Sequence, residues 1–401
     1  MTLDAWWFLL VPVLFGMGWF AARLDRRNDT RRESLPGSYF KGLNFLLNEQ
    51  HDKAIDAFVD VVRIEPETVE LHFALGSLFR RRGETERAIR VHQNLVARND
   101  ITAEQREHAL FELGQDYLKS GLLDRAEDAF NRLEGSQYRA AALQHRLQIA
   151  QMVRDWPEAI RLAELLDRDP GEVTRPQIAH FHCEMADALA AGKPGEGSAP
   201  PVPASLGGAR EALGRAAQAA PKHPRPGLRR GQLELADGHP AEAVEAFRRA
   251  FELDPRYAAL VAEQWMQAHQ QLGQTEAGTA ELQKLQETTP SVDVLQTVYR
   301  AILDAEGQQA ASDYLEKALR QAPSLLGYRQ LLDARLADGN PAHNREEIEL
   351  AQELIRRQAD RLSRYLCSHC GFSARKFYWQ CPGCSRWDTY APRRAEEQER
   401  Q

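Results

Sequence analysis

The sequence predicts an all-α protein: a superhelix of stacked helix pairs, with one apolar helix before it and a small metal-binding module after it. Three observations support this prediction. From residue 39 onward the chain is rich in Ala, Leu, Glu, Gln and Arg and poor in Ile and Thr, which favours helix over strand. Small and aromatic residues recur at a regular interval, and four of the five cysteines lie between Cys367 and Cys384. The first two observations indicate repeated helix pairs, and the third indicates a metal site.

The composition excludes several classes of protein. The chain has 401 residues, of which 43% are apolar and 27% are charged, so wholesale disorder is excluded. The formal net charge of -7 argues against general nucleic-acid binding, which depends on Lys and Arg neutralising phosphates. The clustered cysteines do not resemble the framework of a small secreted protein, which spreads an even number over a short chain. We therefore expect a reducing compartment and no nucleic-acid partner.

Residues 1–23 are predicted to form a transmembrane anchor. The stretch from Ala5 to Ala22 carries no charge, and as a helix it would be ~27 Å long, close to the ~30 Å of a bilayer core. Arginines follow this stretch, so the positive-inside rule places everything after residue 23 in the cytoplasm. A cleavable signal peptide would need positive charge before the apolar run and a small-residue cleavage site after it, and neither is present. Residues 24–38 are polar and are interpreted as a juxtamembrane linker.

Residues 39–345 are predicted to form an array of roughly eight repeats. The interval from Gly42 to Gly76 equals the period of the tetratricopeptide repeat, which is about 34 residues. The same step separates further alanines: Ala54 from Ala88, and Ala243, Ala277 and Ala311 from one another. Several independent steps of this length, with the right residue types, indicate tetratricopeptide repeats rather than an ordinary helical bundle.

The best-matching repeat, residues 231–255, shows what each characteristic position of the repeat pattern would do. Gly231 lets the first helix approach the second, Ala243 fits their crossing, Phe247 fills the groove between them and Pro255 ends the second helix. Each helix pair has an apolar face that only a neighbouring pair covers, so we expect a superhelix whose concave groove binds peptides or protein surfaces. Residues 192–208, rich in Gly, Pro, Ser and Ala, are expected to form a flexible insertion in the array.

One stretch inside the array, HFHCE at residues 180–184, carries residue types that bind metals. On a helix His180 and Glu184 share one face, while His182 and Cys183 point elsewhere, so the four side chains do not meet at one ion. We interpret Cys183 as a buried packing residue. The sequence contains no HExxH motif, nucleophile elbow or dinucleotide-binding loop on a suitable element, so we expect no enzyme activity and no catalytic residue.

Residues 366–392 are predicted to form a metal-binding knuckle. Two CxxC pairs with ten residues between them supply the ligands, which are Cys367, Cys370, Cys381 and Cys384. Two such turns present four thiolates to one ion, zinc or iron, and this closed set leaves no open position for catalysis. Gly371 and Gly383 are expected to take positive φ angles in the turns. The metal should supply most of the folding free energy of so small a module.

The knuckle carries more aromatic residues than its own core can bury: Phe372, Phe377, Tyr378, Trp379, Trp387 and Tyr390. We expect several of them to pack on the terminal helix of the array, predicted for residues 346–365. Nucleic-acid binding through Arg375, Lys376 and these aromatics is the other interpretation of a zinc ribbon. The tail, residues 393–401, is highly charged and is expected to be disordered.

The order of these parts resembles the lipopolysaccharide assembly protein B family of Gram-negative bacteria over essentially the whole chain. The closest local matches are the anchor, the HFHCE stretch and the knuckle pattern YxCxxCGFxxxxxYWxCPxC. The resemblance implies a rubredoxin-like module whose four cysteines bind iron or zinc. The insertion at residues 192–208 departs from the family's pattern.

The resemblance also implies a function. Members of the family are non-enzymatic regulators of lipopolysaccharide synthesis, with a single span in the inner membrane, a periplasmic N-terminus and the bulk of the chain in the cytoplasm. Their partners are the membrane protease FtsH, the lipid A deacetylase and other lipopolysaccharide assembly proteins. The resemblance is also compatible with an oligomer of this chain. Two alternatives stay open: a general tetratricopeptide scaffold or cochaperone for envelope proteins, without a proteolytic role, and an iron-dependent redox sensor.

Overall fold

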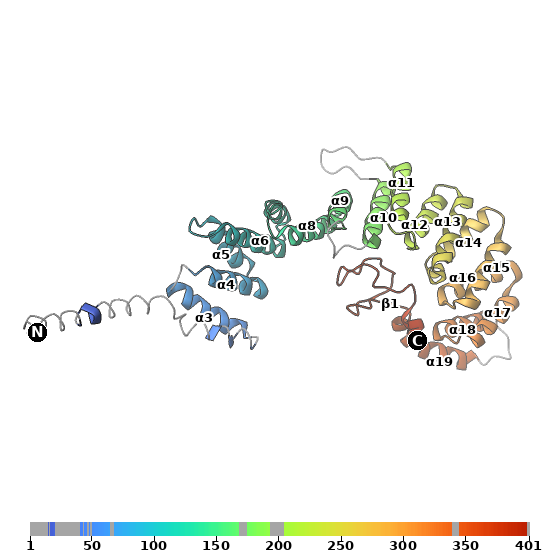
Figure 1. The fold of residues 1–401 in the computed structure, drawn as a ribbon. Coiled ribbons are helices and arrows are strands. Elements are labelled where there is room, and N and C mark those ends of the chain that lie inside the picture. The colour runs from blue at the N-terminus through green and yellow to red at the C-terminus, as the bar shows by residue number, and fades with distance from the viewer. Residues whose placement is uncertain are drawn as a thin grey trace, which may run out of the picture. The chain divides into compact units, whose positions relative to one another are not determined.

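The structure, a computed structural model, contains two compact units, unit 1 (residues 1–153) and unit 2 (residues 154–401) (Figure 1). Most of the predicted anchor, the whole of the predicted linker and residues 193–203 of the predicted insertion lie outside the described residues. Among the residues that are described, no helix combines the length and the apolar character needed to cross a membrane. The described residues are 15, 17–20, 41–42, 44–45, 48, 50–64, 68–167, 175–192, 204–338 and 345–398.

Unit 1 is built from helices that each pack against the next. Gly83, at a φ of 86°, ends α4 in the left-handed conformation, which glycine adopts without strain. Thr102 starts α6 with a capping box, in which its side chain and that of Gln105 each accept the other residue's backbone N–H. The helices are α3 (His51–Ile64), α4 (Val69–Arg82), α5 (Thr85–Ala97), α6 (Ala103–Lys119), α7 (Leu123–Asn131) and α8 (Arg139–Val153).

Unit 2 continues the pattern of helix pairs, and its helices from α10 to α19 form an arc around the C-terminal segment (Figure 1). The helices are α9 (Trp156–Asp167), α10 (Arg175–Ala191), α11 (Leu206–Ala219), α12 (Arg225–Ala236), α13 (Pro240–Leu253), the 3-10 helix η1 (Pro255–Leu260), α14 (Ala262–Gln271), α15 (Thr275–Thr288), α16 (Val292–Glu306), α17 (Gln308–Gln321), α18 (Leu325–Asp338), α19 (Arg345–Leu362) and α20 (Ala395–Gln398). Two short strands, β1 (Tyr365–Leu366) and β2 (Ser373–Ala374), form an antiparallel hairpin between α19 and α20.

The close helix crossings use the predicted glycine and phenylalanine positions. Phe58, Phe130 and Phe247 are fully buried, and each ring lies against a glycine sixteen residues earlier in the chain. A Cβ atom added at Gly231 would lie 2.4 Å from the Phe247 ring, closer than real atoms come, so a side chain there would force α12 and α13 apart. The roles predicted for these two residues are therefore confirmed.

One repeat departs from the predicted pattern. Ala243 and Ala311 are fully buried, but Ala277, which the repeat period places beside them, is exposed. The buried small residue in this repeat is Gly278, where a Cβ atom would lie 2.6 Å from the His269 ring. The rings of α14 leave room only for a glycine at this point, so the close contact moves by one residue.

Two further predictions are wrong, the end of the insertion and the disorder of the tail. The predicted insertion, residues 192–208, ends too late, because α11 begins at Leu206, where the side chain of Ser205 caps the helix. The predicted disordered tail, residues 393–401, is ordered over its described part, residues 393–398, which includes α20. Acidic side chains of α20 are buried against helix ends in the array, as described below, and these contacts explain the order.

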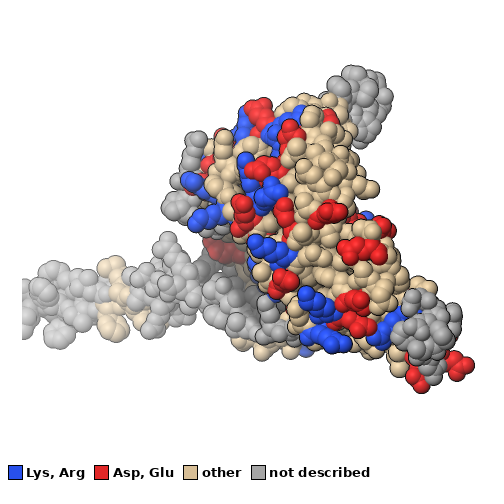
Figure 2. Space-filling model, turned by 90° about the vertical axis from the view of Figure 1, so that its right-hand side faces the viewer, with Lys and Arg blue, Asp and Glu red and all other residues tan. Residues whose placement is uncertain are grey.

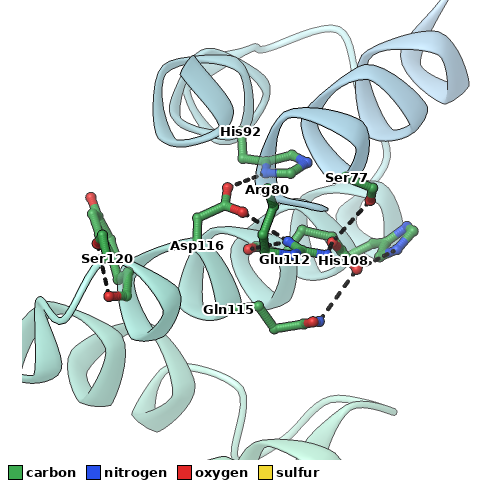
Figure 3. Close-up of polar contacts among 9 residues, drawn as sticks. Ser77, Arg80, His92, His108, Glu112, Gln115, Asp116 and Ser120 are labelled. Atoms are coloured by element: carbon green, nitrogen blue, oxygen red, sulfur yellow. Dashed lines mark hydrogen bonds and ion pairs between the residues drawn. The ribbon is translucent and has the colours of Figure 1, made fainter. Parts of the chain in front are cut away.

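Unit 1 has a buried polar network that the repeat pattern did not predict (Figure 3). One repeat period after Phe58 the chain has His92, a histidine in the position that phenylalanine fills in other repeats. His92 and Asp116 are fully buried and bonded to each other. Arg80 donates to Asp116 at 2.8 Å and to Glu112 at 2.6 Å, so polar side chains from α4, α5 and α6 meet in one cluster. Such a cluster specifies how the three helices pack.

We predict that this network makes unit 1 sensitive to acid. Burial alone would raise the pKa of Glu112, but His108, with its Nε2 atom 3.7 Å from the carboxylate, and the hydrogen bond from Arg80 outweigh it and lower the pKa from 4.5 to about 2. Ionised Glu112 therefore stabilises unit 1 above pH 4.5, and this stabilisation is lost as the pH falls from 4.5 towards 2. In Glu112→Gln, hydrogen exchange of α4 and α6 should depend less on acid over this range than in the parent protein.

The matched control for this prediction is Glu107→Gln, because Glu107 lies on the same helix and has no hydrogen bond or ion pair with the described residues of the network. The control should keep the parent's acid dependence. If Glu112→Gln also kept the full acid dependence, the assignment of this effect to Glu112 would be wrong.

The outer face of unit 2 carries mixed charge. Figure 2 shows Lys and Arg side chains interspersed with Asp and Glu over the face drawn. Ion pairs join neighbouring helices of this unit, among them Arg248 with Glu281 at 3.0 Å and Arg300 with Glu263 at 2.9 Å. These four side chains are 40% or more exposed, so each pair adds little to stability. Over the described residues of the face drawn, basic side chains form no continuous surface of the kind that tracks a nucleic-acid backbone.

Candidate metal centre

The four predicted ligands lie together beside the β1–β2 hairpin. The Sγ atoms of Cys367 and Cys384 are 3.8 Å apart, and those of Cys370 and Cys381 are 3.7 Å apart. Metal–sulfur bonds of ~2.3 Å in a tetrahedron place the sulfur atoms ~3.8 Å from one another. The two CxxC turns therefore form a cluster with the dimensions of a four-thiolate site for one metal ion.

The residue after each CxxC pair takes the left-handed conformation. Gly371 follows the first pair with a φ of 73°, as predicted, and Ser385 follows the second with a φ of 56°. The prediction of a positive φ at Gly383 is wrong. Glycine is favoured there for space, because a Cβ atom would lie 3.1 Å from the Phe372 ring. The backbone N–H of Gly383 also donates to Cys381 Sγ at 3.4 Å.

The thiols of the cluster differ in acidity. Burial raises the pKa of Cys367, but hydrogen bonds from Thr389 and from the backbone amides of Cys370 and His369 outweigh it and lower the pKa to about 6. The amide of Phe372 lowers the pKa of Cys370, but desolvation and the neighbouring sulfur atoms raise it to about 12. Protein groups alone therefore favour the thiolate of Cys367 and disfavour that of Cys370, and a bound cation would compensate the charge of the thiolates.

The knuckle lies on the inner side of the arc in unit 2 (Figure 1), and two of its tryptophans contact the array. The Trp387 ring stacks on His180 of α10, with 4.7 Å between ring centroids. The Trp379 ring stacks on Tyr257 of η1 at 5.4 Å, with 3° between the ring planes. The prediction that the aromatics pack on the terminal helix is wrong for both tryptophans. Two rings earlier in the array, the buried His180 and the partly buried Tyr257, are their stacking partners.

Arg225 of α12 is the centre of this contact. The side chain is 1% exposed, and its guanidinium group lies 5.1 Å from the Trp379 ring centroid and 5.5 Å from that of Trp387. It donates to His180 Nδ1 at 2.7 Å and to Glu184 Oε1 at 2.6 Å. The predicted shared face of His180 and Glu184 is thus confirmed, and both side chains use it to bind this arginine.

Asp388 completes the contact from the knuckle. Its carboxylate lies 2.7 Å from His180 Nε2 and 3.3 Å from His223 Nε2, and its own φ is 54°, which is rare outside glycine. Burial raises the pKa of Asp388, but hydrogen bonds from the two histidines outweigh it and lower the pKa below its usual range. Burial lowers the pKa of His180 to about 4, so this imidazole is neutral at physiological pH.

The arrangement of donors shows that this His–His–Asp cluster is a hydrogen-bonded contact rather than a second metal site. Arg225 only donates, so His180 Nδ1 accepts its hydrogen bond and the His180 proton is on Nε2, facing Asp388. The backbone N–H of Arg225 donates to His223 Nδ1 at 3.2 Å, which places the His223 proton on Nε2 as well. Neither Nε2 atom has a lone pair free for a metal.

The segment after the knuckle caps two helices of the array. Glu396 accepts from the Leu326 N–H at 3.2 Å and from the Ser324 hydroxyl at 3.0 Å, at the start of α18. Glu397 accepts from the Val292 N–H at 2.7 Å, at the start of α16. Carboxylates are favourable at helix N-termini because these ends carry unpaired N–H groups and positive partial charge. Residues 365–398 therefore contact α10, α12, η1, α16 and α18 and lie on the inner, concave side of the arc in unit 2 (Figure 1).

The sequence revealed some of these residues and not others. The four cysteines come together as predicted, and Cys183 is fully buried, with a pKa raised to about 12 by burial, as expected for a packing residue. Arg225, His223 and Tyr257 were not singled out. The signal available for them was the excess of aromatic residues in the knuckle, which indicates a buried partner surface without showing where it lies.

Helix pairs of the tetratricopeptide type and a four-cysteine knuckle define the class of repeat proteins with an attached metal-binding module. A family model described as a rubredoxin metal binding domain matches residues 365–392, and a tetratricopeptide repeat model matches residues 228–257. Lipopolysaccharide assembly protein B of Escherichia coli K12 is 35% identical over 388 residues, which cover 96% of this chain and 97% of the relative. The protein of the same name from Haemophilus influenzae is 28% identical over 396 residues, covering 96% and 97%. The chain belongs to the lipopolysaccharide assembly protein B family.

Proposed function

We propose that this protein is a membrane-tethered adaptor that regulates lipopolysaccharide synthesis. The observation that carries the proposal is the similarity to a lipopolysaccharide assembly protein over 96% of the chain, array and knuckle included. In this proposal the adaptor brings the lipid A deacetylase to the membrane protease FtsH and so controls how fast the deacetylase is degraded. Other lipopolysaccharide assembly enzymes are further partners.

The tether is placed in residues 1–23, as a single span of the inner membrane with a periplasmic N-terminus. Four described residues of this stretch support it: they are helical, and their apolar side chains are 56–77% exposed, namely Phe15, Met17, Trp19 and Phe20. Exposure of this much apolar surface to water is unfavourable, and a lipid core would remove the cost. The bulk of the chain is then cytoplasmic.

The knuckle is assigned a structural role. A closed set of four thiolates leaves a metal ion no open position for a substrate, so no catalytic step is assigned to it. The residues that would bind zinc or iron are Cys367, Cys370, Cys381 and Cys384. When bound, the ion supplies the cross-link that a module with so small a core lacks.

The experiment that tests the proposal measures the half-life of the deacetylase in cells depleted of this protein and complemented with variants. The full chain should shorten the half-life, and a chain lacking residues 1–22 should not. Fusing the truncated chain to an unrelated single-span anchor should restore the effect, which separates the tether from a folding defect. A half-life that does not respond to the full chain would contradict the adaptor and favour a scaffold without a proteolytic role.

A further inference from the structure

Helix α19 has two apolar faces, and the array uses only one of them. The first face packs on α18 and includes Ala359 and Leu362, which are 2% and 7% exposed and lie against Leu326. Gln352 on the same side donates to Asp333 of α18. These contacts account for how α19 is attached to unit 2.

The second face carries a pair of large apolar side chains that are mostly exposed. Leu350 and Leu354 are 64% and 59% exposed, and they are four residues apart, which places them side by side on the helix. Terminal helices of repeat arrays need a polar outer face to stay soluble on their own. Two exposed leucines at the end of the array therefore indicate that another helix packs here.

The charges around this leucine pair are arranged in a self-complementary way. Glu347, Leu350, Leu354 and Arg357 follow one another at steps of three, four and three residues, so they form one stripe along the helix with a coiled-coil repeat. The acidic residue of this stripe lies before the leucines and the basic residue after them. Over the whole helix, Glu346 and Glu347 occupy the first turn and Arg361 the last.

We propose that this stripe binds a second copy of the chain, through an antiparallel pair of α19 helices. In this arrangement Leu350 packs on Leu354 of the second copy, and Glu347 meets Arg357 of the second copy, each contact occurring twice across the two-fold axis. A parallel pair would instead place Glu347 against Glu347 and Arg357 against Arg357. Because the interface is a single short helix on each side, the dimer is weak and depends on concentration.

Charge reversal tests this directly in the full chain in detergent, with sedimentation equilibrium as the measurement. Glu347→Arg and Arg357→Glu each turn two attractive contacts into two repulsive ones and should raise the dimer Kd about tenfold. The double variant Glu347→Arg/Arg357→Glu restores both contacts with the charges exchanged, so its Kd should return towards that of the parent. The matched control is Glu252→Arg, an exposed glutamate on α13, which should leave the Kd unchanged.

The rescue is the decisive readout, because Arg357 also lies 3.4 Å from Glu353 of its own helix and a purely local effect of Arg357→Glu would not be repaired by a change at residue 347. Circular dichroism of all four variants should match the parent, since the changed side chains are exposed. A parent protein that stays monomeric at the highest concentration reached would overturn the proposal. A dimer whose Kd in both single variants equals that of the parent, as expected for association through the N-terminal segment, would also overturn it.

Discussion

Cys381→Ser is expected to abolish metal binding and unfold the knuckle. Structural zinc contributes about 10–16 kcal/mol to the folding of small metal modules, and this knuckle has a core of only a few buried side chains. The effect should extend into unit 2, because Trp379, Trp387 and Asp388 of the knuckle cover Arg225 and His180. Metal analysis and limited proteolysis of residues 365–398 measure the two consequences separately.

The control for this prediction is Cys183→Ala, which changes the fifth cysteine. Cys183 is fully buried on α10, away from the cluster, so the variant should bind one metal ion per chain and keep the parent's proteolysis pattern. Chelation of the metal from the parent protein should reproduce the effect of Cys381→Ser. A protease-resistant knuckle in the metal-free protein would show that the metal does not stabilise the fold.

Arg225→Ala is expected to release the knuckle from unit 2 while the metal stays bound. The change leaves His180 and the partly exposed Glu184 without their donor and opens a cavity between two tryptophans, which together should cost about 2–4 kcal/mol. Tryptophan fluorescence should shift to the red as Trp379 and Trp387 become exposed to water. The metal content should remain one ion per chain.

Arg230→Ala provides the comparison on the same helix. Arg230 is 40% exposed, and its partner Glu234, which is 3% exposed, keeps a second arginine, Arg210, at 2.6 Å. The loss of Arg230 should therefore cost about 1 kcal/mol and leave the fluorescence unchanged. Equal effects of the two substitutions would mean that the buried position of Arg225 does not matter. Loss of metal in Arg225→Ala would mean that the knuckle depends on the array to bind its ion.

The sequence predicted the parts that depend on local spacing. The repeat period and the glycine–phenylalanine pairs identify helix crossings such as Gly231 with Phe247, because the residue types follow from the space between two adjacent helices. The CxxC pairs identify the metal ligands because the two cysteines of each pair lie in one turn, where local spacing alone brings their thiolates together. Cys183 was recognised as a packing residue because it does not lie on the helix face that His180 and Glu184 share.

Contacts between distant parts of the chain were not predictable in this way. Asp388 meets His180 across 208 positions of sequence, and Glu397 meets Val292 across 105. In the sequence, Asp388 and Glu397 look like any exposed acidic residue. The tail was predicted to be disordered because a run of charges usually is, and the prediction failed because two helix N-termini provide the N–H groups that its carboxylates bind.

The central claim is that the metal knuckle fastens the inner side of unit 2. Hydrogen exchange measured by mass spectrometry on the metal-loaded and metal-free full chain tests it most directly. The account predicts that removing the metal increases exchange in residues 365–398 and at the starts of α16 and α18, where Val292 and Leu326 lose their capping carboxylates, while unit 1 is unchanged. Unchanged protection at the starts of α16 and α18 in the metal-free protein would contradict it.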